Sequence, residues 1–375
     1  DGTSILNLNS TGVLKLTPPG GLIIEGTMNW NNGAIEGNGS LDITGTLNVI
    51  PGVNTAVNAT VINDGVINVV EGGTINGSQE ILNRGNLFVT DTTDFNLQIE
   101  NKNSGIFSVD SSYNQVDITH SQTFYNQHGS KYVFGIGVSN FNTNVKLSNA
   151  NFLNEGTLQF EANVGTGNYL FDLNGNNHYL YNSGDINVLD NATINVEGAT
   201  LDSSGGEIVI DYGAALTIDG GLGGAFTFDQ GFVLLASGLA QNGLASLNFV
   251  GQVTINLASD FTLFDTPVVI DSSGGDVTVL GDMFRIHADA EMTMNSNDHV
   301  NTSGFHNYGT LNLQGNGIFI EAPFENFGFL DVIGDAGGGL KTIDNDFNNQ
   351  GSILLTTSPG KNNILEIGAA GTTAV

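Results

Sequence analysis

The sequence lacks cysteine, has few basic residues and little proline, and contains no long apolar run. Without Cys the chain forms neither disulfides nor thiol-based sites. The absence of Cys is found in large exported bacterial proteins as well as in cytosolic proteins. Only 8 Lys and Arg stand against 38 Asp and Glu, which gives a formal net charge of −30. Nucleic acids and anionic membrane surfaces are bound through basic side chains, so neither is expected as a partner. No apolar run approaches the ~20 residues of a membrane-spanning helix, so no membrane insertion is expected.

The first residues also lack the features of a secretory leader. The chain starts Asp-Gly-Thr, without a charged segment followed by an apolar one. We therefore expect this chain to be a mature fragment of a longer protein.

Glycine and asparagine are abundant instead. Gly accounts for 52 of the 375 residues, whereas Pro accounts for only 6. Gly and Asn without Pro indicate many tight turns between strands. The hydrophobic fraction of 39% is enough to build a core, and no 3.6-residue apolar stripe of an amphipathic helix is found.

One pattern recurs along the chain: apolar-x-Asn-x-Gly-x-apolar-x-apolar. Looser versions of it stand at 101–109 and 124–134. The glycines of neighbouring copies are about 19 to 28 residues apart. Repeats of this length indicate a solenoid, in which each coil buries its apolar side chains only by stacking on the next. The copies that fit best are VINDGVINV (61–69), ILNRGNLFV (81–89), FLNEGTLQF (152–160), LYNSGDINV (180–188), FHNYGTLNL (305–313), FENFGFLDV (324–332) and FNNQGSILL (347–355).

The repeat predicts both a turn and a side-chain ladder. Alternation of apolar residues places one side of each short strand inward. The Asn-x-Gly step is expected to supply the turn, because Gly and Asn tolerate a positive φ. The repeated amides are expected to point inward and bond to each other and to turn backbone groups; the alternative is that they suit a tight turn and face solvent. The seven predicted ladder residues are Asn63, Asn83, Asn154, Asn182, Asn307, Asn326 and Asn349.

The predicted fold is all-β, a right-handed parallel β-helix of about 15 coils that forms a single domain over 1–375. A left-handed hexapeptide helix would demand a stricter period. A variant-repeat region at about 190–300 lacks the Asn-x-Gly signature but holds two near-copies, DSSGGEIVI (202–210) and DSSGGDVTV (271–279). We interpret it as the same solenoid with a different turn; a separate inserted domain is the alternative. Residues 231–250 are where a helix or an excursion is expected.

These repeats resemble bacterial β-helical exoproteins, namely filamentous-haemagglutinin-like adhesins and autotransporter passenger domains. The matching segments are the copies quoted above, above all FLNEGTLQF, FHNYGTLNL and FNNQGSILL, and they span most of the chain. The resemblance implies export and a role in adhesion, aggregation or matrix. The chain departs from the family in having no recognisable secretion domain at its start and no membrane-barrel strand at its end.

Polysaccharide lyases and galacturonan hydrolases also use β-helices, so catalysis has to be tested at the site. The hydrolase pattern is Asn-Thr-Asp, Asp-Asp, His-Gly and Arg-x-Lys, and only His128-Gly129 is present. Lyases need basic side chains to meet substrate carboxylates. We therefore do not expect an enzyme. The eight basic residues are scattered at Lys15, Arg84, Lys102, Lys131, Lys146, Arg285, Lys341 and Lys361.

The most site-like stretch is GDMFRIHADAEMTM (281–294). If it is one strand, its polar and charged residues share one face, and its apolar residues share the other. Such a stripe suits a sugar or a cation; the alternative is an ordinary solvated face. The polar stripe consists of Arg285, His287, Asp289 and Glu291, opposite Phe284, Ile286, Ala288, Ala290 and Met292.

No cofactor is expected. The six histidines show no zinc-ligand spacing. Calcium takes carboxylate and carbonyl oxygens from acidic turns and is the alternative, although the GGxGxDx repeat of calcium-binding β-rolls is absent. The candidate calcium ligands are Asp344 with Asp346, and Asp202 or Asp271 beside their Gly-rich turns.

The sequence favours an extracellular structural or adhesive β-solenoid, secreted or at a bacterial cell surface. The first alternative is a carbohydrate-binding or carbohydrate-cleaving β-helix, and the second is an ice-binding solenoid, which needs Thr at the coil period. Expected partners are surface glycans and other copies of the chain. End-to-end contact is expected because both ends read as uncapped alternating strands, with Leu6 and Leu8 at one end and Leu365 and Ile367 at the other.

Overall fold

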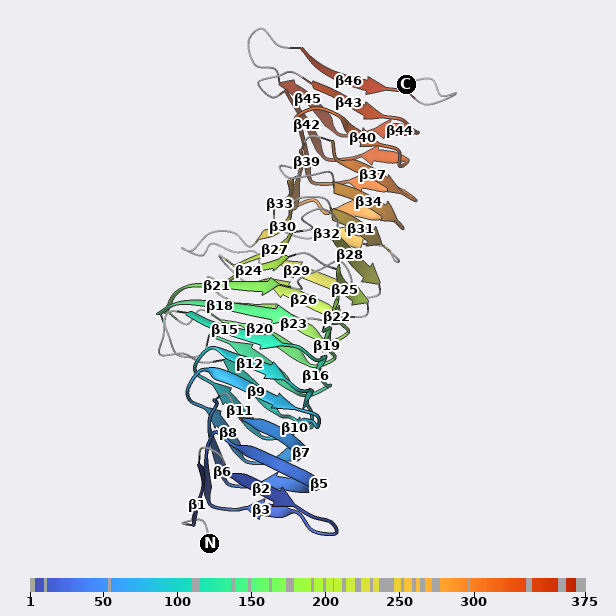
Figure 1. The fold of residues 1–375 in the computed structure, drawn as a ribbon. Helices are drawn as coiled ribbons and strands as arrows, with labels where there is room; N and C mark the ends of the chain where they lie inside the picture. Colours follow the sequence, from blue (N-terminus) through green and yellow to red (C-terminus); the bar gives the residue numbers. More distant parts are fainter. Residues whose placement is uncertain are drawn as a thin grey trace. The chain divides into compact units, whose positions relative to one another are not determined.

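Every regular element in the described part of the chain is a β-strand, and the strands stack in parallel as a β-solenoid (Figure 1). The structure is a computed structural model. It describes residues 4–9, 12–52, 55–109, 115–135, 139–147, 150–161, 164–172, 179–189, 192–197, 200–204, 206–210, 214–219, 224–229, 232–235, 246–250, 253–257, 261–263, 267–271, 277–295, 297–334, 339–356 and 362–368. The predicted fold class is confirmed, while the handedness and the coil count stay predictions.

The chain divides into two units. Unit 1 comprises Asp1–Asn174 and His178–Ile194, and unit 2 comprises Gly175–Asn177 and Asn195–Val375. The division runs through β24 (Ala192–Glu197). The single-domain organisation stays a prediction, and each unit is described by itself.

In unit 1, each coil contributes strands to three parallel stacks. Stack A contains β1 (Ile5–Asn9), β4 (Thr27–Asn31), β6 (Thr46–Ile50), β8 (Val66–Val69), β11 (Asn86–Val89), β14 (Ile106–Val109), β17 (Lys131–Phe134), β20 (Thr157–Phe160) and β23 (Asp185–Val188). Stack B contains β2 (Val13–Leu16), β5 (Ala34–Ile43), β7 (Ala56–Asn63), β9 (Gly73–Gly77), β12 (Thr93–Asn96), β15 (Gln115–His120), β18 (Ser139–Leu147) and β21 (Val164–Asp172). Stack C contains β3 (Leu22–Ile24), the second halves of β5 and β7, β10 (Ile81–Asn83), β13 (Ile99–Asn101), β16 (Phe124–Asn126), β19 (Phe152–Asn154) and β22 (Tyr179–Asn182).

Unit 2 is built in the same way. Stack D contains β25 (Thr200–Ser204), β28 (Gly224–Asp229), β31 (Val253–Leu257), β34 (Val277–Gly281), β37 (His299–Thr302), β40 (Ile318–Ile320), β43 (Gly339–Ile343) and β46 (Asn363–Ile367). Stack E contains β27 (Ala215–Asp219), β30 (Ser246–Val250), β33 (Pro267–Asp271), β36 (Glu291–Met294), β39 (Thr310–Gln314), β42 (Phe329–Ile333) and β45 (Ser352–Thr356). Stack F contains β32 (Phe261–Leu263), β35 (Phe284–Ile286), β38 (Phe305–Asn307), β41 (Phe324–Asn326) and β44 (Phe347–Asn349), and β26 (Glu207–Ile210) pairs with β29 (Phe232–Leu235).

The core of each unit follows from the alternation of apolar residues. In β7 every second residue is buried, from Val57 to Asn63. Parallel register then places like side chains directly over one another. Phe124 and Phe152 stack with ring centroids 5.0 Å apart. In unit 2, Phe305 and Phe324 stack in the same way at 5.0 Å. Both phenylalanine pairs precede the ladder asparagine by two residues, so the repeat itself sets this core.

The repeat glycines serve a different purpose from the expected one. None of the seven has a positive φ, so the prediction that they supply a left-handed turn is wrong. Instead, a Cβ added to any of them would lie closer than 3.0 Å to a backbone oxygen of the preceding coil. Glycine is required here because two backbones approach too closely for a side chain.

The variant region keeps its strands. The near-copy at 202–210 covers parts of β25 and β26, and the near-copy at 271–279 covers parts of β33 and β34. These strands belong to different stacks, so the two near-copies do not occupy equivalent positions in the coil. Within 231–250 the structure describes β29 (Phe232–Leu235) and β30 (Ser246–Val250), and residues 231 and 236–245 lie outside the described residues.

No helix in the part of the chain that the structure describes is long and apolar enough to cross a membrane.

Candidate functional site

An inward asparagine ladder runs along the corner between stacks C and A of unit 1. Each amide except the last donates one N–H to the Oδ1 of the next asparagine, over 2.6 to 2.9 Å. The second N–H donates to a backbone carbonyl three to five residues after that next asparagine, for example from Asn63 to the carbonyl of Asn86 at 3.0 Å. All the amides are buried, so the ladder satisfies corner carbonyls that water does not reach. Its members are Asn63, Asn83, Asn101, Asn126, Asn154 and Asn182.

Two of these rungs, Asn101 and Asn126, were not among the seven predicted residues. They belong to the looser repeats, in which the turn between Asn and Gly is longer. The ladder therefore tolerates spacings from 18 residues, between Asn83 and Asn101, to 28 residues, between Asn154 and Asn182. Insertions at the turns leave the strand register intact.

In unit 2 the ladder is shorter. Asn307 donates to Asn326 and Asn326 to Asn349, both at 2.7 Å. Ile286 occupies the equivalent position in the coil before Asn307, and the buried Oδ1 of Asn307 finds no donor among the described residues. Asn349 is exposed, contrary to the prediction, because β44 is the last strand described in stack F and none of the described residues forms a further coil over it.

The ladder yields a stability prediction. Replacing Asn154 by Leu removes a group that accepts from Asn126 and donates to Asn182 and to the carbonyl of Asp185. We expect a loss of about 2 kcal/mol in the free energy of unfolding, because buried polar partners are left unpaired. Urea denaturation measures it. Asn348→Leu is the control, since Asn348 is exposed on β44 and is not a rung of the ladder, and it should change stability by less than about 0.5 kcal/mol. Equal effects of the two substitutions would contradict an energetic role for burial of the ladder.

The polar stripe is not one strand. Residues 284–286 form β35 and residues 291–294 form β36, and the segment between them is a turn closed by a hydrogen bond from the Ala290 N–H to the His287 carbonyl at 3.0 Å. Ala288 is exposed instead of facing the core. The physical reason is the coil itself, which changes direction here between stacks F and E. The four predicted residues nevertheless lie outside the core: Arg285 and His287 are partly exposed, and Asp289 and Glu291 are exposed.

This turn borders a patch of aromatic and polar side chains that the sequence did not reveal. Tyr308 and Phe327 stack with ring centroids 4.8 Å apart and an interplanar angle of 5°. Tyr308 is 42% exposed, and Phe329 at the start of β42 is 36% exposed. We call this the corner patch; it consists of Arg285, His287, Asp289, Glu291, His306, Tyr308, Glu325, Phe327 and Phe329.

Register places these residues side by side on successive coils. Arg285 pairs with His306, and His306 with Glu325, across stack F. Glu291, Thr310 and Phe329 follow one another across stack E. The residue between Asn and Gly in the repeat was the available signal: it is aromatic at Tyr308 and Phe327 but charged at Asp64 and Arg84, which form an ion pair in unit 1.

Close polar contacts orient the side chains of the corner patch. His306 Nε2 lies 3.3 Å from Glu325 Oε2, and His287 Nδ1 lies 3.6 Å from Asp289 Oδ2. Asn312 Nδ2 donates to Glu291 Oε1 at 2.6 Å. Aromatic rings beside oriented carboxylate and imidazole groups can bind a sugar by stacking on its C–H groups and hydrogen-bonding its hydroxyls.

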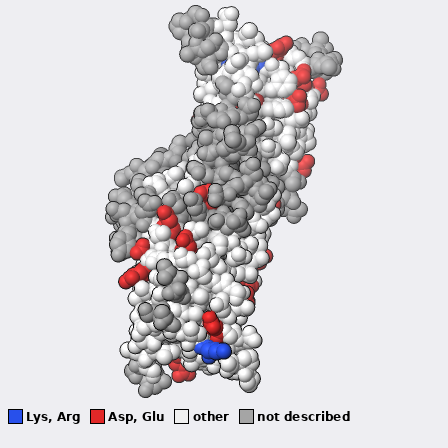
Figure 2. Space-filling model, viewed as in Figure 1, with Lys and Arg blue, Asp and Glu red and all other residues white. Residues whose placement is uncertain are grey.

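The described carboxylates proposed for calcium lie on the surface, and calcium binding stays a prediction. Asp344 and Asp346 are exposed, and Asp202 is partly exposed. The side chain of Asp271 lies outside the described residues. Within the described ranges no three His, Cys, Asp or Glu side chains form a group suited to a metal ion. On the face drawn in Figure 2, acidic side chains are more numerous than basic ones.

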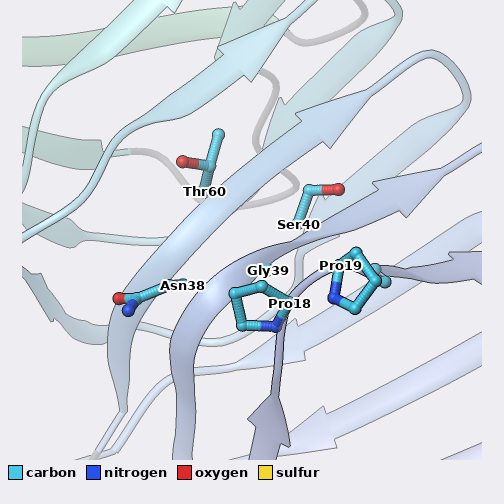
Figure 3. A pocket seen from close by; sticks show the side chains of 8 residues that line it. Pro18, Pro19, Asn38, Gly39, Ser40 and Thr60 are labelled. Atoms are coloured by element: carbon cyan, nitrogen blue, oxygen red, sulfur yellow. The ribbon is translucent and has the colours of Figure 1, made fainter.

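A shallow depression of about 360 Å³ lies in unit 1 (Figure 3). None of its walls carries a charged side chain. It is lined by Pro18, Pro19, Gly20, Gly21, Asn38, Gly39, Ser40 and Thr60.

A titratable group lies in the core of unit 1. His120 is buried and stacks on Phe95 with ring centroids 5.6 Å apart, and its Nε2 lies 3.2 Å from Tyr132 Oη. Burial lowers the pKa of His120 to about 3 and raises the pKa of the Tyr132 hydroxyl well above its usual value. His120 is therefore a neutral core residue at pH 7.

The terminal leucines and isoleucine named for end-to-end contact are at least partly exposed. Leu6 is 40% and Ile367 43% exposed. Association through the ends stays a prediction.

No protein-family model, no curated protein and no solved structure matches this chain.

Proposed function

We propose that this chain is an extracellular adhesive β-solenoid at a bacterial cell surface, and that its corner patch binds glycans. The observation that carries the proposal is the exposure of Tyr308 and Phe329, with the partly exposed Phe327 stacked on Tyr308, in a patch that also holds Glu291 and Glu325. Exposed aromatic rings grouped with polar side chains are typical of binding surfaces. The repeats' resemblance to bacterial adhesins supports the same reading.

The scaffold suits adhesion because it is rigid. Parallel ladders, a buried amide ladder and stacked phenylalanines fix each coil on its neighbours, so a patch on the corner keeps its shape in the absence of ligand. Preorganisation of this kind lowers the entropy lost on binding. The corner patch carries more carboxylates than cations, so we expect the glycan to be uncharged or to carry amino groups.

Glycan-array binding tests the proposal. We expect Tyr308→Ala and Phe327→Ala each to weaken binding roughly tenfold, the loss of about 1.4 kcal/mol of stacking. The melting temperature should change little, because Tyr308 is on the surface. The matched control is Tyr181→Ala in unit 1, which removes an exposed ring stacked on Tyr179 at 5.2 Å.

Unchanged binding in both patch variants would contradict the proposal, as would an equal loss in the Tyr181 control. A parallel assay for reducing ends released from acidic polysaccharides tests the cleaving alternative. Product release that depends on Glu325 would favour cleavage over adhesion.

A further inference from the structure

An uncharged strip covers one face of unit 1, far along the chain from the corner patch. Alternate residues of β1, β4, β6, β8 and β11 face outward from stack A, and none of these outward residues is charged. In a chain with a net charge of −30, five successive strands without a charged outward residue are notable. The first outward charge in stack A is Lys131, in β17. We call this face the neutral strip.

A second asparagine ladder runs along the middle of the neutral strip. Asn29 donates to Asn7 at 2.9 Å, Asn48 to Asn29 at 2.9 Å, and Asn68 to Asn48 at 3.0 Å. In the buried ladder the second amide N–H donates to a backbone carbonyl. In this outer ladder the hydrogen bonds of the described residues use one N–H of Asn29, Asn48 and Asn68 and none of Asn7. Each rung therefore retains a donor, and acceptor capacity on its oxygen, for a ligand.

The ladder ends at an aromatic ring. Phe88 follows Asn68 in register on β11, faces outward and is partly exposed. The strip thus offers hydrogen-bonding groups every ~4.8 Å along the strand-stacking direction, and then a ring on which a ligand can stack.

We infer that the neutral strip binds an uncharged, extended polysaccharide lying along the amide ladder. Hydroxyl groups both donate and accept, which matches what each amide rung has left. An acidic polymer finds no cation on the strip and is repelled by the rest of the chain. An apolar ligand would bury the amides without partners. A peptide strand finds no free edge, because the strands of stack A on either side already pair.

Retention of the full chain on insoluble cellulose, with alginate gel as the acidic probe, tests the inference. We expect retention on cellulose that stays constant between about 0.05 and 0.5 M salt, since neither partner contributes charge. Asn48→Asp, which breaks the ladder and adds a charge, and Phe88→Ala should each reduce retention roughly tenfold. The matched control is Asn76→Asp, because Asn76 accepts from Asn96 at 2.9 Å in an outward amide pair on stack B; it should bind normally.

Several results would overturn the inference: no retention of the unchanged chain, equal loss with Asn76→Asp, or retention on alginate that falls with salt. If Asn48→Asp misfolds, Phe88→Ala still tests the inference. Circular dichroism checks that both variants fold. If sedimentation instead shows a dimer that Asn48→Asp dissociates, the strip is an interface between copies and the inference fails. Tyr308→Ala should leave cellulose retention unchanged, so this result is independent of the corner patch.

Discussion

Gly85→Ala is expected to lower the free energy of unfolding by about 3 kcal/mol. A Cβ at this position would lie closer than 3.0 Å to the carbonyl oxygen of Gly65 and to the carbonyl carbon of Asp64 in the coil below. These are backbone atoms, so no side-chain rotation relieves the clash. The coils must separate, which stretches the hydrogen bonds from the N–H groups of Arg84 and Gly85 to the Asn63 carbonyl, both at 2.7 Å.

The matched control is Gly20→Ala in the same unit. Its nearest neighbour would be the Thr17 carbonyl oxygen at 4.0 Å, and its φ lies outside the left-handed region. Alanine there should be neutral or stabilise slightly, because it restricts the unfolded chain. Since solenoids open locally, hydrogen exchange of the coils that contain Gly65 and Gly85 is the appropriate measurement. Equal protection of the amides from hydrogen exchange in Gly85→Ala and Gly20→Ala would show that the coils accommodate the added Cβ without loss of stability.

The fold followed from the sequence because one pattern encodes both strand and corner. Alternating apolar residues before and after Asn-x-Gly define two strands, and their fixed distance from the Asn sets the register, as in Ile81–Asn83 over Val61–Asn63. The reason for the glycine was misjudged. A sequence shows that glycine is needed, but whether a positive φ or a close backbone approach requires it depends on the coil below.

Only part of the corner patch could be predicted from the sequence, for a related reason. Residues 284–292 alternate like a strand, yet the chain turns at 287–290, because Ile286 aligns with the ladder position of Asn307. Apolar and polar residues can alternate along a single strand, and they can also alternate through a turn that joins two strands. The alternation alone therefore does not distinguish the two. The aromatic residues at Tyr308 and Phe327 lie 19 positions apart, so their contact becomes apparent only once the coil register is known.

The outer ladder was missed although its residues fit the alternation. Asn29, Asn48 and Asn68 lie on the outward side of their strands, where single polar residues are unremarkable. Only the register between coils shows that they form a column. For the buried His120 the signal was weaker still, since a lone histidine in a strand does not reveal which face it occupies.

Lowering the pH from 7 to 4 is expected to cost unit 1 about 3 kcal/mol through His120 alone. In the unfolded chain a histidine binds a proton near pH 6.5, whereas burial lowers the pKa of His120 in the folded protein to about 3. Between these values the unfolded state holds the extra proton, so stability falls as the pH drops from about 6.5 to about 3. At pH 4 roughly 2.5 units of that interval have been crossed, at 1.36 kcal/mol each.

The double variant His120→Phe with Tyr132→Phe isolates this effect. It replaces both polar partners by rings that fit beside Phe95 and Phe107, so no buried polar group is left unpaired. We expect it to lose about 3 kcal/mol less than the unchanged chain between pH 7 and pH 4 in urea denaturation of unit 1 monitored by hydrogen exchange. His128→Gln is the control: this histidine is exposed, and its replacement should leave the acid sensitivity intact. Identical pH profiles for the unchanged chain and the double variant would mean that carboxylates, and not His120, set the acid limit of the fold.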